Sequence, residues 1–259
     1  MASASETVRV AAVGDLHVTR DAGGKLQALF THVASHADVL LLCGDLTDFG
    51  LPDEAHVLVK ELAAAGKVPV VAILGNHDFE SNQPSEVRRV LEEGGVTVLD
   101  GESCVVHGVG FAGAKGFMGG FGRRSLEPWG EPAVKDLVRE AVNEGLKLES
   151  ALARLRTQEK VAVLHYSPIA ATVEGEPKEI FPFLGSSRLE EPLDRFRVTT
   201  VFHGHAHHGQ LEGRTRGGAA VYNVALPLLI NRFPDQPPVR IVELPAVPRE
   251  QRVDAAATA

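Results

Sequence analysis

Histidine and aspartate, two residue types that bind metal ions, recur in short clusters along this sequence. The densest cluster is VFHGHAHHG, residues 201–209, which holds four of the 11 histidines of the chain. Imidazole and carboxylate groups suit Mn, Fe, Zn or Co, whereas structural zinc sites often use cysteine thiolates. A histidine cluster alone also fits a polar surface tract. The choice depends on whether other segments supply matching ligands.

Further candidate ligands directly follow four other apolar runs. GDLH follows TVRVAAV, GDLTD follows ADVLLLC, GNHD follows VPVVAIL, and His165 follows KVAVL, while the histidine cluster itself follows VTTVF. A single aspartate after glycine is most often a turn residue or a helix cap. If the polar residues after all five apolar runs were only turn residues or helix caps, each of the five would need its own separate explanation. The pattern therefore predicts one shared metal site.

The predicted donors are oxygen and imidazole nitrogen, with no thiolate among them. Their number exceeds what one tetrahedral ion needs. We therefore expect two metal ions that share a carboxylate.

The apolar runs must position these ligands. Residues 7–13, 37–43 and 68–74 are almost continuously apolar, which is typical of strands buried on both faces. The segments between them, 23–37 and 52–67, repeat apolar residues at intervals of three and four, as helices do. This order predicts a mostly parallel sheet with right-handed crossovers. Such sheets bind ligands at the carboxyl ends of their strands.

The remaining chain is predicted to form a single domain with the first part, over residues 1–245. Residues 96–116 indicate short antiparallel strands, and residues 131–160 indicate a helix that Gly145 could interrupt. Residues 160–164 and 198–202 predict two more buried strands. Residues 219–225 and 238–244 close the fold. We expect the closing half to be more antiparallel than the opening half. Residues 246–259 are rich in proline and alanine and predict a disordered tail.

Composition excludes several classes of protein. The formal net charge of −8 disfavours a binder of nucleic-acid polymers, which would need a basic face. Two cysteines are too few for a disulfide scaffold and suit a reducing compartment. No apolar run approaches the roughly 18 residues of a membrane helix, and the first residues lack the features of a signal peptide. We expect a cytoplasmic protein with no membrane partner.

The motif series D-x-H, GD, GNHD, H and GHxH, in this order, resembles the calcineurin-like metallophosphoesterases. The match runs from Gly14 to His207 and covers most of the chain. The resemblance implies an α/β fold in which two mixed β-sheets form a sandwich flanked by α-helices. It also implies a dinuclear metal site at the carboxyl-terminal ends of the strands.

Roles carry over from the resemblance motif by motif. The implied ligands of the first ion are Asp15, His17 and His207, those of the second are Asn76, His165 and His205, and Asp45 bridges the two. The ions are divalent or trivalent, and Mn, Fe, Zn and Co all suit this donor set.

The resemblance assigns substrate binding to Asn76 and His77. His77 would also protonate the leaving oxygen, and Asp78 would orient His77 through its carboxylate. His203 and His208 fall outside the motif, and we expect structural roles for them.

The implied reaction is phosphate ester hydrolysis by a metal-bridging hydroxide, with His77 as the general acid. Phe49-Gly50 follows GDLTD where protein phosphatases of the family carry Arg-Gly, so that branch is disfavoured. The negative net charge disfavours the nuclease branch. We expect a bacterial-type phosphodiesterase acting on a small or nucleotide substrate.

Two alternatives remain open at this point, a phosphomonoesterase and a metal-stabilised binding module without turnover. The glycine-dense segment 115–130 also has two interpretations, a lid or pocket wall and a plain surface loop.

Overall fold

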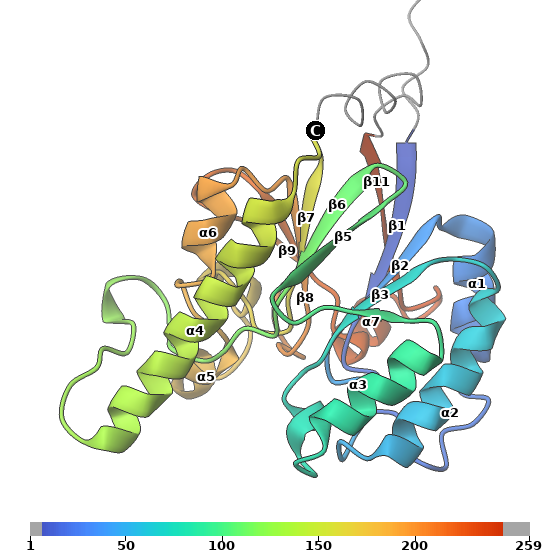
Figure 1. The fold of residues 1–259 in the computed structure, drawn as a ribbon, viewed down its shortest axis with the longest axis horizontal. Coiled ribbons are helices and arrows are strands. Elements are labelled where there is room, and N and C mark those ends of the chain that lie inside the picture. Colours follow the sequence, from blue (N-terminus) through green and yellow to red (C-terminus); the bar gives the residue numbers. More distant parts are fainter. Residues whose placement is uncertain (1–6, 246–259) are drawn as a thin grey trace, which may run out of the picture.

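The computed structural model describes residues 7–245, apart from the side chain of Arg124. The predicted tail, 246–259, lies outside the described residues. Two β-sheets occupy the middle of the molecule, and helices cover their outer faces (Figure 1). The predicted sandwich of two mixed sheets with flanking helices is confirmed.

The first sheet has the strand order β11-β1-β2-β3-β4. Its strands are β1 (Thr7–Val13), β2 (Val39–Cys43), β3 (Val70–Ile73), β4 (Thr97–Val98) and β11 (Arg240–Pro245). β1 to β4 run parallel, and β11 pairs antiparallel with β1. The fully buried sequence of β2, VLLLC, shows why the run is apolar throughout: sheet and helices cover both of its faces.

The second sheet has the order β5-β6-β7-β8-β10-β9. Its strands are β5 (Glu102–Val106), β6 (Val109–Gly113), β7 (Lys160–Val163), β8 (Thr200–His203), β9 (Glu212–Arg214) and β10 (Ala220–Asn223). The expected antiparallel hairpin is β5–β6, but β6, β7, β8 and β10 run parallel. All three antiparallel pairs, β5–β6, β9–β10 and β1–β11, involve strands of the closing half, as expected, although most of the second sheet is parallel.

Helices connect the strands and cover both sheets. The α-helices are α1 (Gln27–His36), α2 (Pro52–Leu62), α3 (Pro84–Glu93), α4 (Pro132–Arg154), α5 (Phe181–Leu184), α6 (Glu190–Arg195) and α7 (Leu226–Arg232). The 3₁₀ turns are η1 (Ala63–Ala65), η2 (His77–Phe79), η3 (Gly122–Arg124), η4 (Ala170–Thr172) and η5 (Lys178–Ile180). α1 to α3 lie beside the first sheet, and α4 and α6 beside the second (Figure 1). No helix in the described range 7–245 is long and apolar enough to cross a membrane.

Alternation along the second sheet divides the core in two. Phe111, Val161 and Phe202 belong to the cluster that also contains the first sheet. Their chain neighbours Ala112 and Ala162 belong to the cluster formed with α4. This period of two is the normal geometry of a strand with both faces covered.

Gly145 does not interrupt the long helix, and α4 continues through it. A Cβ at this position would lie 3.3 Å from the carbonyl oxygen of Arg188. Glycine therefore serves the close approach of the chain before α6, which outweighs its low helix propensity.

Candidate active site

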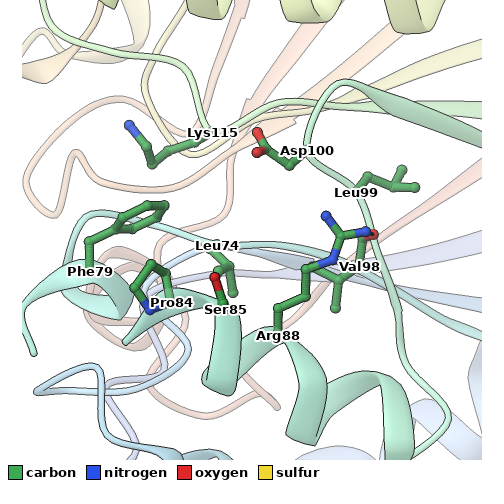
Figure 2. A pocket seen from close by; sticks show the side chains of 9 residues that line it. All are labelled: Leu74, Phe79, Pro84, Ser85, Arg88, Val98, Leu99, Asp100 and Lys115. Carbon is green, nitrogen blue, oxygen red and sulfur yellow. Dashed lines mark hydrogen bonds between the residues drawn. The ribbon is translucent and has the colours of Figure 1, made fainter. Parts of the chain in front are cut away.

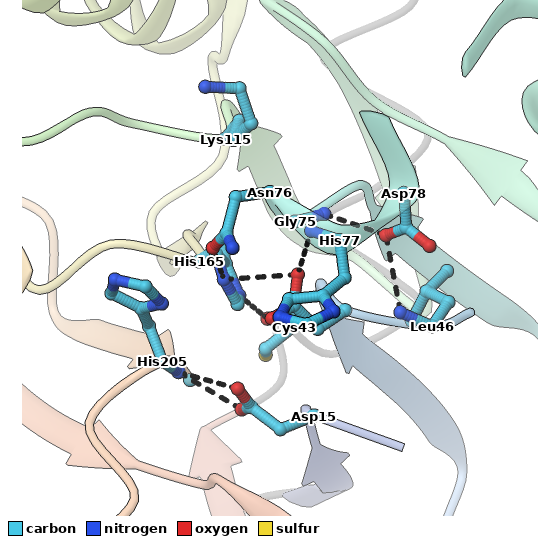
Figure 3. Close-up of polar contacts among 12 residues, drawn as sticks. Asp15, Cys43, Leu46, Gly75, Asn76, His77, Asp78, Lys115, His165 and His205 are labelled. Carbon is cyan, nitrogen blue, oxygen red and sulfur yellow. Dashed lines mark hydrogen bonds and ion pairs between the residues drawn. The ribbon is translucent and has the colours of Figure 1, made fainter. Parts of the chain in front are cut away.

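The predicted metal ligands converge at one edge of the sandwich, formed by the carboxyl ends of β1, β2, β3, β7 and β8 (Figure 3). Potential ligand atoms lie within 4.8 Å of one another in three groups: Asp15, His17 and His207; His17, Asp45 and His77; Asp45, His165 and His205. Asn76 joins the last group, because its Oδ1 lies 2.9 Å from His165 Nε2. Asp45 belongs to two groups, which suits a bridging role.

Several of these residues have a backbone conformation that L-amino acids rarely adopt. The φ angles are 55° at Asp15, 43° at His17, 47° at Asp45 and 69° at His205. Left-handed conformations of non-glycine residues cost free energy and persist where the surrounding structure enforces them. Here main-chain hydrogen bonds enforce them: Asp15 N–H donates to the Gly44 carbonyl over 2.9 Å, and His17 N–H to the Asp45 carbonyl over 3.0 Å.

Three glycines beside candidate ligands make room for a ligand on another strand. A Cβ on Gly44 would lie 2.5 Å from Nδ1 of His165, and φ at Gly44 is +81°. A Cβ on Gly75 would overlap Asp45, and one on Gly204 would overlap the Asp15 carboxylate. The repeated glycines therefore let the strand ends of the two sheets meet closely.

Second partners fix the orientation of two ligand histidines. His165 Nδ1 lies 3.0 Å from the Cys43 carbonyl oxygen, so that this nitrogen carries the proton and Nε2 faces the site. His17 Nδ1 lies 3.0 Å from Asp48 Oδ1. Such partners are typical of metal-binding histidines because they set the tautomer.

His17 Nε2 is the clearest sign that a cation fits here. Among the described residues it is one of few buried polar side-chain atoms without a hydrogen-bond partner. It lies 3.8 Å from Asp45 Oδ2, too far for a hydrogen bond. A buried nitrogen lone pair facing a carboxylate is costly in the protein alone and is satisfied by a metal ion between the two.

Electrostatics at His165 point the same way. Burial opposes protonation of this ring, but Asp45, with Oδ1 3.3 Å from Nε2, outweighs it and raises the pKa of His165 to about 9. Burial also opposes ionisation of Asp45, yet His165 holds the pKa of that carboxyl well below its usual range. The pair thus favours positive charge at this position, where a metal cation would replace the proton.

The GHxH segment provides the remaining candidate ligands. His207 Nε2 lies 3.0 Å from Asp15 Oδ1, and this hydrogen bond raises the pKa of His207. The main-chain N–H of His205 donates to both oxygens of Asp15 over 3.0 Å. Burial, followed by the neighbouring His165, lowers the pKa of His205 to about 4, so the ring is neutral and can act as a ligand.

His77 lies beside the ligands and is half-buried. Its main-chain N–H donates to Asp45 Oδ1 over 2.8 Å, and its ring centroid lies 4.5 Å from that of His17. His77 Nδ1 lies 2.8 Å from the main-chain carbonyl oxygen of Asp48. That contact orients the ring and leaves Nε2 free to meet a substrate.

The expected hydrogen bond between Asp78 and His77 is wrong. The fully buried Asp78 carboxylate accepts bonds from the main-chain N–H of Gly75 and Thr47, both over 2.8 Å, and from the Thr47 hydroxyl over 2.6 Å. The turn η2 points the adjacent side chains of His77 and Asp78 in different directions (Figure 3). Asp78 therefore joins the strand-end loops after β2 and β3, and the Asp48 carbonyl orients His77.

The structure places the two remaining histidines of the cluster outside the ligand groups. His203 is fully buried, and its ring nitrogens lie 2.7 Å from the Gly204 carbonyl and 2.8 Å from the Thr172 hydroxyl. Burial lowers the pKa of His203 to about 4. His208 is exposed, and its main-chain N–H donates to Glu176.

Sequence reasoning missed two residues beside the site, Asp48 as a partner of His17 and Lys115. Lys115 closely follows β6, and its carbonyl oxygen accepts the main-chain N–H of His165 over 3.1 Å. The sequence GAKG after an apolar strand repeats the pattern of glycine and polar residue seen at the ligand-bearing strand ends. That repetition is the signal that could have identified Lys115.

Comparisons with known proteins identify the family. The sequence profile of the calcineurin-like phosphoesterases matches residues 8–209, so the chain belongs to this family. No curated protein matches the sequence. The chain is a metal-dependent phosphoesterase, a hydrolase of phosphate esters, and it has groups of side chains that can hold metal ions.

Solved structures share the fold. Phosphopantetheinyl hydrolase from Mycobacterium tuberculosis has a TM-score of 0.65 and 14% identity, covering 90% of this chain and 95% of that one. A putative 5′-nucleotidase from Staphylococcus aureus has a TM-score of 0.51 and 18% identity, covering 84% and 48%. A purple acid phosphatase from yellow lupin seeds has a TM-score of 0.55 and 13% identity, covering 87% and 44%.

Proposed function

We propose that this protein is a dinuclear-metal phosphodiesterase acting on a small or nucleotide substrate. One ion would be held by Asp15, His17 and His207, the other by Asn76, His165 and His205, and Asp45 would be shared. When bound, the ions neutralise phosphoryl charge and lower the pKa of bound water. Mn, Fe, Zn and Co all fit these donors, and manganese is the one to test first.

The residues of the chain supply orientation and a proton. Asn76 would contact the phosphoryl group of the substrate as well as the metal ion. His77 would donate a proton from Nε2 to the leaving oxygen, since the Asp48 carbonyl holds its Nδ1. Asp78 would be a positioning residue, because its carboxylate binds main-chain N–H groups of the loops that carry Asp45 and His77.

The observation that carries the diester assignment is that three exposed phenylalanines lie on the segments that carry the site. Phe49, Phe79 and Phe183 are exposed to 57%, 40% and 54%. Phe49 follows Asp48 and Phe79 follows Asp78, while the Phe183 carbonyl lies 3.2 Å from His205 Nε2. Exposed aromatic rings at a phosphate site suit organic substituents, including nucleobases, on the phosphate.

Charge favours the same choice. A diester carries one negative charge where a monoester carries up to two. Phe49 stands where the protein phosphatases of the family have an arginine, so this chain offers less positive charge for a monoester dianion.

The test compares bis(p-nitrophenyl) phosphate with p-nitrophenyl phosphate, in added Mn²⁺ and in chelator. We expect chelator-sensitive turnover with a higher kcat/KM for the diester. Preference for the monoester would identify a phosphomonoesterase, and absence of turnover with each of the four metals would identify a binding module.

We also infer a single domain over residues 1–245 and a cytoplasmic location. One hydrophobic cluster includes residues from both sheets, which supports the single domain. Cys43 and Cys104 are both free thiols, as suits a reducing compartment.

A further inference from the structure

A cavity of about 200 Å³ lies near the predicted ligands, at the ends of β3 and β4. Leu74, Phe79 and Leu99 give it apolar walls, and Arg88, Asp100 and Lys115 bring charge to it. Figure 2 shows Lys115 and Phe79 at one end, with Arg88 and Leu99 toward the other. Small-molecule sites usually measure about 300–1,000 Å³, so this cavity has room for one part of a ligand.

Two of its three charged side chains are neutralised within the protein. Arg88 pairs with Glu92 over 2.8 Å and with Glu102 over 3.2 Å. Asp100 pairs with Lys147 over 2.8 Å. Arg88 has two carboxylate partners, and Lys147 also pairs with Glu144, so neither group leaves a positive charge for a ligand.

Lys115 differs, because it has no ion pair with any carboxylate in the described part of the chain. Its half-buried Nζ donates to the Gly116 carbonyl over 3.0 Å. It otherwise lies over three aromatic rings, 4.9 Å from the centroid of Phe117, 5.3 Å from Tyr166 and 5.5 Å from Phe79. Ring faces attract an ammonium group but bring no compensating charge. Glu144 and Asp100 act on Lys115 only through space, so its ammonium group can still pair directly with an anionic ligand.

Lys115 is also close to the second ligand group. Tyr166, whose ring it covers, lies 4.4 Å from the ring of His205 between centroids. Figure 3 shows the side chain of Lys115 on the side of the site that carries Asn76 and His205. A molecule whose phosphate is bound at the ligands can therefore extend toward Lys115.

The segment that carries Lys115 is fixed in place from α4. Glu144 is fully buried, and its carboxylate accepts the main-chain N–H of Gly116 over 2.8 Å. Lys147 donates to the other oxygen of Glu144 over 2.7 Å. The start of the 115–130 segment is thus a cavity wall held by buried hydrogen bonds.

We propose that this cavity receives one ester arm of the substrate and that Lys115 binds an anionic group, a phosphate or a carboxylate, on that arm. This inference rests on the proposed phosphodiesterase function, and it narrows the substrates to diesters with a second negative charge. The apolar walls at Phe79 and Leu99 would contact the organic part of the same arm.

The test uses substrate pairs that differ in one anionic group. The adenylyl dinucleotides pApA and ApA differ by a terminal phosphate, and glycerophosphoserine and glycerophosphoethanolamine differ by a carboxylate. Preference of the unsubstituted protein for pApA identifies a phosphate, and preference for glycerophosphoserine a carboxylate. Lys115→Met should lower that preference, as a ratio of kcat/KM values, by about tenfold or more, the usual cost of a charged hydrogen bond.

Controls separate this effect from general damage. Lys115→Arg should restore most of the preference, and Lys135→Met changes the net charge equally at an exposed position on α4. If Lys115→Met leaves the kcat/KM ratio of both substrate pairs unchanged, the inference is overturned. Turnover of bis(p-nitrophenyl) phosphate by the unsubstituted protein would still support the proposed phosphodiesterase function. If no diester is hydrolysed, calorimetric binding of pApA against ApA to the Mn²⁺-treated protein gives the same comparison, and equal affinities overturn the inference.

Discussion

The two sheets contribute different chemistry to one site. The strand ends of the first sheet bring both carboxylates, Asp15 and Asp45, together with His17. The strand ends of the second sheet bring imidazoles, from His165, His205 and His207. Both carboxylates therefore come from the first sheet, whereas the second sheet brings only imidazoles to the described groups.

The histidines of the site are also oriented by different means. His17 is held by the side chain of Asp48, over 3.0 Å. His165 and His205 are held by the main-chain carbonyls of Cys43 and Phe183, over 3.0 and 3.2 Å. His207 likewise meets the side chain of Asp15, and His77 meets the main-chain carbonyl of Asp48. Substitutions can remove the side-chain partners but leave the main-chain partners in place.

The largest effect is expected at the shared carboxylate. Asp45→Asn removes the negative charge that both ligand groups use, so activity should fall roughly 10⁴-fold or more, as for members of one catalytic unit. The measurement is kcat/KM for bis(p-nitrophenyl) phosphate in excess Mn²⁺. His207→Asn removes one neutral donor of the second sheet and should lose less. Equal losses in the two variants would remove the distinction between the sheets.

His77→Ala tests the proton donor of the first sheet. Turnover of esters with poor leaving groups should fall by about 10²–10⁴-fold, the usual contribution of a general acid. p-Nitrophenolate leaves readily without a proton, so its esters should lose less. Metal content, measured by plasma mass spectrometry, should stay unchanged, and loss of metal in this variant would instead make His77 a ligand.

Asp48→Ala tests orientation by a side chain. The change should weaken metal affinity by about 10–100-fold, as removal of the partner of a ligand histidine typically does. Titration with Mn²⁺, followed by turnover, measures the shift. Asp53→Ala is the matched control, since the exposed Asp53 has Arg20 as its ion-pair partner among the described residues. An Asp48 variant with unshifted affinity would show that packing alone holds His17.

The smallest effect tests the contact between the sheets. Gly44→Ala should lower the free energy of unfolding in urea by about 1–3 kcal/mol beyond the cost in Gly24→Ala. Both glycines have similar φ values, +81° and +85°, but a Cβ at Gly24 meets no atom within 4 Å. The difference isolates the contact of Gly44 with His165. Equal costs would mean that the two strand ends can separate freely.

The sequence predicts the sandwich and the grouping of ligands well, because both depend on local patterns. Continuous apolar runs mark strands buried on both faces, and the glycine beside each polar residue marks a close approach that only glycine permits. Asp45 and His165 could therefore be placed together although they are distant in the chain.

Other features depend on the direction of a side chain or a strand, which the sequence patterns do not show. His77 and Asp78 are adjacent, yet a 3₁₀ turn directs them to different partners. The parallel pairing of β6 with β7 follows from the crossover through α4, and their short apolar runs fit either direction. GAKG could have marked Lys115, but the lack of an ion pair at Lys115 among the described residues can be seen only in the structure.

The central claim is that side chains of both sheets form one site for two metal ions that hydrolyses a phosphodiester. The most direct test strips the protein with chelator, titrates it with Mn²⁺, and follows bound metal and bis(p-nitrophenyl) phosphate turnover together. We predict two ions per chain, with full turnover only when both are bound. Full turnover of the stripped protein, or saturation at one ion per chain, would contradict the account.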